Sequence, residues 1–105
     1  MNIEFYFDPS CPFCWITSRW LLMVSNDRDI TISWKPFSLA LKNDELESDH
    51  TPHSKNHRGA HRLLRVMMAA NQNHNASLIE MYTTSGISHH VAGDAFDDEL
   101  ITNVL

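Results

Sequence analysis

Residues 7–15 read FDPSCPFCW, and this stretch decides how the first part of the chain is organised. It follows a short apolar run at residues 3–7 that is typical of a strand. It opens a segment, residues 12–26, whose apolar side chains recur at helical spacing. A thiol at the first turn of a helix faces unpaired N–H groups and the positive end of the helix dipole, which favour the thiolate. We therefore predict that Cys11 is the nucleophile of a redox dithiol, and that Cys14, one turn along the same face, resolves mixed disulfides.

A pair of cysteines with this spacing can also be half of a zinc site. The chain has two cysteines, so histidines would have to complete such a site, and the candidates are His50, His53, His57 and His61. The last three are spaced to share one face of a helix. Against zinc, Pro12 fits the first position of a helix better than the turn of a zinc knuckle. We favour the redox dithiol and expect no bound metal, with zinc as the alternative.

Length and charge exclude several classes of function. A chain of 105 residues has the size of one domain, and its net charge of −5 comes without clustered lysine or arginine. This balance argues against nucleic acid or an anionic membrane as the main partner. The apolar runs are too short to span a bilayer, and the N-terminus lacks the features of a signal peptide. We therefore expect a cytoplasmic protein whose dithiol is kept largely reduced.

The rest of the chain reads as one more strand and several helices. Alternation over residues 30–37 predicts a second strand, and strand, helix and strand with short links predict a parallel pair with a right-handed crossover. Residues 42–51 are polar and indicate a loop. A Thr51 cap followed by proline predicts a helix that runs toward Asn71.

Two shorter helices are expected after that. One covers residues 77–85, and the other begins with Asp94 or Asp97 as its cap. Three tryptophans are expected in the core: Trp15, Trp20 and Trp34. We interpret His89 and His90 as helix caps or solvent-exposed groups. Asp8, beside the thiols, is either a turn former or a proton relay, and the turn is favoured.

The motif resembles one known family. Residues 7–21, FDPSCPFCWITSRWL, and residues 38–43, SLALKN, resemble the DsbA-like thioredoxin-fold proteins known as mycothiol-dependent nitroreductases, near the FrnE-type cytoplasmic oxidoreductases. The resemblance covers the whole chain, most strongly up to Asn43. It implies an α/β, thioredoxin-like fold, with a β-α-β unit at residues 1–41 and part of an inserted helical domain at residues 42–105.

The resemblance also implies the functional residues. Cys11 would be the nucleophile and Cys14 the resolving thiol, and the substrate would be contacted by Pro12, Phe13, Trp15 and Asn43. Phe13 stands where the family usually has tryptophan, and Asn43 matches a position used near the active site. No cofactor would be bound. A low-molecular-weight thiol such as mycothiol would be the co-substrate, and a disulfide or an electrophilic small molecule would be the partner.

One feature of thioredoxin folds is missing from this sequence. The later antiparallel hairpin, with a cis-proline facing the thiol, has no counterpart, since the prolines are Pro9, Pro12, Pro36 and Pro52. We therefore expect an N-terminal portion of a larger fold whose C-terminal half is absent. The first strand would have an open edge, and Phe5, Phe7 and Trp34 would lose their cover. Such a chain is expected to form homo-oligomers.

These observations predict a thiol-disulfide oxidoreductase, and the resemblance implies a mycothiol-dependent reductase. The alternative belongs to another class. It is a non-enzymatic half-domain that associates with copies of itself and whose dithiol is vestigial.

Overall fold

The computed structural model describes residues 1–43, 46 and 51–105. Most of the expected loop at 42–51 lies outside the described residues. The elements, in chain order, are β1 (Asn2–Phe7), α1 (Pro12–Asp27), β2 (Thr31–Pro36), α2 (Leu39–Lys42), α3 (Pro52–His74), α4 (Leu78–Gly86), a π-helical turn η1 (Ile87–Val91) and α5 (Asp98–Val104). Among the described residues, no helix is long and apolar enough to cross a membrane.

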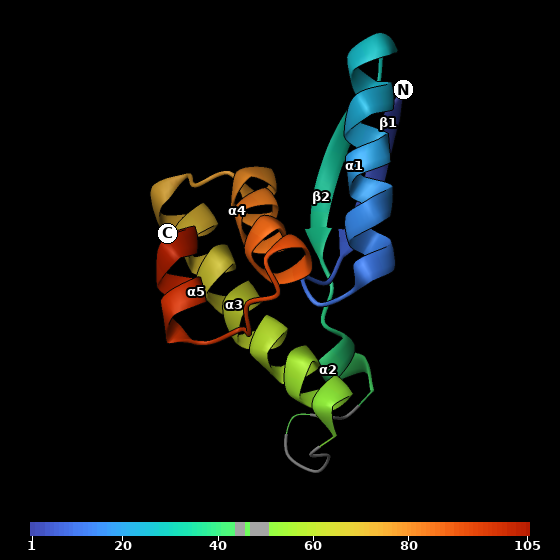
Figure 1. The fold of residues 1–105 in the computed structure, drawn as a ribbon. Coiled ribbons are helices and arrows are strands. Elements are labelled where there is room, and N and C mark those ends of the chain that lie inside the picture. Colours follow the sequence, from blue (N-terminus) through green and yellow to red (C-terminus); the bar gives the residue numbers. More distant parts are fainter. Residues whose placement is uncertain (44–45, 47–50) are drawn as a thin grey trace.

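The two strands pair in parallel, as predicted. Their register runs from Asn2 opposite Thr31 to Phe7 opposite Pro36, and α1 forms the crossover between them. Figure 1 shows α1 lying along this strand pair, with its N-terminal end beside the end of α4. The described sheet has only these two strands. The α/β thioredoxin-like β-α-β unit is therefore present at the start of the chain, followed by helices.

The helix starts follow the predicted caps. The side chains of Thr51, Ser77 and Asp97 each accept a hydrogen bond from the backbone N–H three residues on. Of the two candidates for the last cap, Asp97 is therefore the one used. The helix α3 ends beyond Asn71 because Asn75 adopts a left-handed conformation and caps it. Neither α2 nor η1 was predicted from the sequence.

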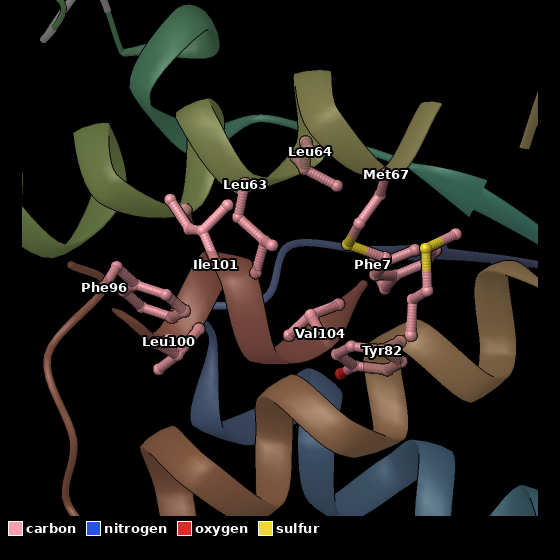
Figure 2. Packing of buried hydrophobic residues seen from close by; sticks show 11 residues of the cluster. Phe7, Leu63, Leu64, Met67, Tyr82, Phe96, Leu100, Ile101 and Val104 are labelled. Atoms are coloured by element: carbon pink, nitrogen blue, oxygen red, sulfur yellow. The ribbon is translucent and has the colours of Figure 1, made fainter. Parts of the chain in front are cut away.

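The main hydrophobic cluster lies between the helices α3, α4 and α5. Its members are Phe7, Ala60, Leu63, Leu64, Met67, Met81, Tyr82, Phe96, Leu100, Ile101 and Val104. Figure 2 shows these side chains meeting between the three helices. Phe7 is the one member that precedes residue 60, and its ring stacks on Tyr82 with a centroid distance of 4.4 Å. The expectation that Phe7 loses its cover is therefore wrong, because α4 supplies the missing surface.

The helix α1 buries less than its apolar pattern suggests. Its buried residues are Ser18 and Leu21. Four large apolar side chains, spaced to share one face, remain exposed, and we call them the exposed face of α1: Phe13, Ile16, Trp20 and Met23. The prediction that Trp20 lies in the core is wrong, since 60% of its surface is exposed. The two described strands cover only one side of this helix.

Candidate active site

Cys11 occupies the N-cap position of α1. Its backbone is extended, with φ −80° and ψ 113°, and its sulfur accepts a hydrogen bond from the Cys14 N–H at 3.3 Å. Pro12 stands in the first turn, where no N–H is needed. The predicted helix start at the dithiol is confirmed. An N–H donor and the helix dipole both point at this sulfur, which is the surrounding that an anionic sulfur requires.

Cys14 lies in a different environment, although it is three residues away. Burial, helped by a hydrogen bond with the Cys11 side chain, raises the pKa of the Cys14 thiol from 9.0 to about 11. Both cysteines are free thiols in this structure. At neutral pH Cys14 is therefore protonated, and it must lose its proton before it can attack a sulfur.

Asp8 organises the turn that leads into Cys11. Its carboxylate is buried, and one oxygen accepts hydrogen bonds from the backbone N–H and the hydroxyl of Ser10. The other oxygen accepts from the Leu39 N–H at 2.8 Å. The Cys11 N–H in turn donates to the Asp8 carbonyl at 3.0 Å. These bonds are those of the predicted turn former, and they also attach the turn to the start of α2.

A pocket of about 430 Å³ opens beside the two thiols. Its lining residues are Tyr6, Asp8, Cys11, Cys14, Phe37 and Leu39. Sequence reasoning missed Tyr6, Phe37 and Leu39. A usable signal existed for Tyr6, because it lies out of phase with Phe5 and Phe7 and must face away from the Phe7 side of the strand.

The four predicted substrate contacts do not gather at this pocket. Pro12 and Phe13 are exposed at the start of α1, and Phe13 belongs to the exposed face of that helix. Asn43 caps the end of α2, where its N–H donates to the Leu39 carbonyl. Trp15 is half-buried and packs edge-on against Tyr82 of α4. Among the described residues, none of these four lines the pocket.

Trp15 is held from several sides. The Arg19 guanidinium lies 4.0 Å from the centre of the Trp15 ring and donates a hydrogen bond to the Thr83 hydroxyl at 2.9 Å. A Cβ built on Gly86 would overlap the Trp15 ring, so glycine is what allows α4 to approach so closely. The tryptophan that follows the second thiol is therefore fixed by the helical part of the chain.

The interpretation of His90 as a cap or a solvent-exposed group is wrong. Its ring stacks on Trp15 with a centroid distance of 5.7 Å, and its Nε2 lies 2.8 Å from the Pro9 carbonyl oxygen. The cause is the π-helical turn η1, in which the Ala92 N–H bonds to the Ile87 carbonyl five residues back. This turn continues α4 toward the dithiol. His89, by contrast, bonds to the Asp94 carbonyl near the end of the turn.

The histidines considered for zinc have other surroundings. His53 and His57 have ring centroids 4.2 Å apart, and His61 Nδ1 lies 2.8 Å from the Ser38 hydroxyl. His50 lies outside the described residues. In the described part of the chain, no group of three or more His, Cys, Asp or Glu side chains is arranged to hold a metal ion.

Comparison with known proteins gives two results. The family model of the Rv2466c-like proteins, described as mycothiol-dependent nitroreductase Rv2466c, matches residues 10–105. A protein of Mycobacterium tuberculosis (strain ATCC 25618 / H37Rv), the uncharacterized protein Rv2286c, is 29% identical over 104 residues. The alignment covers 99% of this chain and 45% of that relative, so the chain spans less than half the relative's length. With a dithiol at the start of the first helix and a family match over nearly its whole length, the chain belongs to the Rv2466c-like family of mycothiol-dependent, DsbA-like reductases.

Proposed function

We propose that this chain carries the dithiol of a thiol-disulfide oxidoreductase, with Cys11 as the nucleophile and Cys14 as the resolving thiol. The observation that carries the proposal is the asymmetry between the two sulfurs. Cys11 Sγ caps a helix and accepts an N–H, whereas burial raises the pKa of Cys14 to about 11. Membership of a family of mycothiol-dependent reductases supports a thiol-dependent redox role.

The reaction transfers two electrons from the dithiol to a disulfide. The Cys11 thiolate attacks one sulfur of the substrate, a Cys11–substrate disulfide forms, and the other substrate sulfur leaves as a thiolate and takes up a proton. Cys14 then loses its proton and attacks Cys11 Sγ. The Cys11–Cys14 disulfide forms and the second substrate thiol is released. Two equivalents of a small thiol, mycothiol in our proposal, then reduce this disulfide again and are themselves oxidised to a disulfide.

The pocket supports a preference for substrates with an apolar body. Tyr6, Phe37 and Leu39 line it beside the thiols, and Asp8 within it is already occupied by the turn. We place the small disulfide or electrophile there, with the exposed Pro12 and Phe13 touching the parts of a larger substrate that lie outside the pocket.

The proposal also keeps four expectations from the sequence. The chain divides into a β-α-β unit at residues 1–41, which carries the chemistry, and a helical region at residues 42–105. Trp15 and Asn43 contribute to substrate binding by shaping the surroundings of the motif. The protein binds no cofactor and works in the cytoplasm, where small thiols keep a dithiol reduced.

The decisive experiment is a redox titration of the intact chain in buffers of reduced and oxidised mycothiol, followed by mass analysis of the Cys11–Cys14 pair. We expect a reversible two-electron couple and mycothiol-dependent reduction of a small aromatic disulfide. Glutathione serves as the comparison thiol. A pair that stays reduced throughout, or that oxidises without reducing any disulfide, would contradict the proposal.

A second candidate function rests on the exposed face of α1. Large apolar side chains are 60% to 80% exposed there, which is typical of a surface that another protein covers. In this reading the chain associates with a second copy and the dithiol has no turnover. Sedimentation at several concentrations should then show a dimer that Trp20→Lys dissociates. Leu41→Lys is the matched control, because Leu41 is an exposed apolar residue outside this face. A dimer without disulfide turnover favours this candidate, and a monomer with turnover excludes it.

A further inference from the structure

His90 connects the helical region to both sides of the dithiol motif. Although 81 residues separate them in sequence, His90 Nε2 and the Pro9 carbonyl oxygen are 2.8 Å apart. The His90 ring also lies nearly parallel to Trp15, at an interplanar angle of 21°. Pro9 stands two residues before Cys11, and Trp15 directly follows Cys14. One side chain therefore touches the segments on either side of the two thiols.

We propose that His90 is a positioning residue for the dithiol, acting through the Pro9 carbonyl and the Trp15 ring. This inference rests on the proposed function of the two thiols. His90 is not in the pocket beside the sulfurs, so it acts on Cys11 through the turn and not by direct contact with a substrate. Its position on a π-helical turn fits this role, because such turns are frequent at functional sites.

The hydrogen bond fixes the form of the imidazole. A carbonyl oxygen can only accept a hydrogen bond. His90 Nε2 therefore carries a proton, and its N–H donates a hydrogen bond to the Pro9 carbonyl. Burial lowers the pKa of His90, and the bond to Pro9 opposes this effect. The titratable groups around it are His89 on the same turn, which lowers the pKa of His90, and Asp8, which raises the pKa of His90. Arg19 lies over the same Trp15 ring. The neutral, Nε2-protonated ring is therefore the form that holds the turn at neutral pH.

The geometry that depends on this contact is the cap at Cys11. The turn from Asp8 to Ser10 places the Cys11 N–H on the Asp8 carbonyl, and Cys11 Sγ then receives the Cys14 N–H. Without the His90 donor, the buried Pro9 carbonyl loses this hydrogen bond. The turn can then shift so that the carbonyl finds another donor. A shift of the turn moves the sulfur away from the Cys14 N–H and the helix N-terminus, which are features that activate a nucleophilic thiol.

The test separates the donor from the ring. His90→Phe keeps an aromatic ring against Trp15 and loses the N–H, whereas His90→Gln keeps a donor of similar reach. The matched control is His74→Phe, at an exposed histidine in the last turn of α3. The readout is the rate at which iodoacetamide alkylates Cys11 as a function of pH, followed by peptide mapping of the intact chain.

We expect His90→Phe to slow alkylation of Cys11 at pH 7 by about three- to tenfold, the equivalent of one hydrogen bond. His90→Gln should stay within about twofold of the unmodified chain, and His74→Phe should match it. A His90→Phe profile that coincides with that of the unmodified chain overturns the proposal. If His90→Phe loses its native circular dichroism, His90→Asn replaces it, because the shorter amide cannot reach Pro9.

Alkylation needs no turnover, so this result is independent of the proposed function. If the unmodified chain shows no disulfide exchange, but the alkylation of Cys11 still depends on His90, the proposed function is rejected and the positioning role is kept. If the unmodified chain does exchange disulfides, but His90→Phe changes neither its redox potential nor its alkylation profile, the function is kept and the positioning role is rejected.

Discussion

The β-α-β unit holds the two thiols, and the helical region holds most of the hydrophobic core. Ten of the eleven residues of the main cluster lie beyond residue 59, and only Phe7 comes from the unit that holds the thiols. The helix α1 buries Ser18 and Leu21, whereas α3 buries six of its side chains. The contacts that join the two regions include Phe7 on Tyr82, Trp15 against Gly86, and His90 on Pro9. The difference indicates that stability and thiol reactivity can be changed separately.

The largest expected effect tests the chemical side of this comparison. Cys11→Ser should reduce disulfide turnover to background, because the nucleophile is lost, while Cys14→Ser should still form a mixed disulfide and then stop. Both substitutions should leave thermal unfolding nearly unchanged. The measurement is turnover together with trapping of the adduct by mass spectrometry. The roles are reversed if limiting iodoacetamide labels Cys14 first in the unmodified chain.

The next effect tests the core. Leu63→Ala should lower the free energy of unfolding by about 2–5 kcal/mol, since Leu63 is fully buried in the cluster between the helices. Leu41→Ala removes the same atoms from a side chain that is 64% exposed, and should change stability by less than about 0.5 kcal/mol. Urea unfolding measures both. Equal losses would mean that the helical region is not the main source of stability.

A smaller effect is expected at the junction of the two regions. Gly86→Ala adds a Cβ that overlaps the Trp15 ring, and overpacking of this kind costs about 1–3 kcal/mol. The loss should shrink when Trp15→Leu removes the ring, which a double-mutant cycle measures. Thr84→Ala, at an exposed site on the same helix, is the control. If the losses in the free energy of unfolding for Gly86→Ala and Trp15→Leu are additive, the two residues are not coupled and their contact does not join the regions.

The smallest effect is a pH dependence that arises from Cys14. Its pKa is raised in the folded chain, to about 11 from 9.0, so the unfolded chain loses this proton first as the pH rises. The stabilisation is therefore complete below about pH 9 and is lost as the pH approaches 11. The free energy of unfolding of Cys14→Ala should fall less steeply between these pH values than the free energy of unfolding of the unmodified chain. Cys11→Ala should keep most of the slope, because burial is the main cause of the shift. Identical slopes for the unmodified chain and Cys14→Ala would contradict this explanation.

The sequence alone determined the features that depend on neighbouring residues. A helix start needs a capping side chain within three residues, and Thr51, Ser77 and Asp97 supply it. The position of Cys11 at a helix N-terminus follows from the same local rule. The two strands follow from their residue patterns, and the short links through one helix predict their parallel pairing. The motif around the thiols also identified the family, because it is long and specific.

Only the tertiary structure decided which surfaces meet. The apolar spacing of α1 predicted a helix but could not say that Trp20 stays exposed, since that depends on how many strands cover it. The pocket wall from Tyr6 and Phe37, and the place of His90 against Pro9, join residues that are far apart in sequence. Such contacts depend on how whole elements pack, and a pattern that repeats every two or four residues carries no information about partners 31 or 81 positions away.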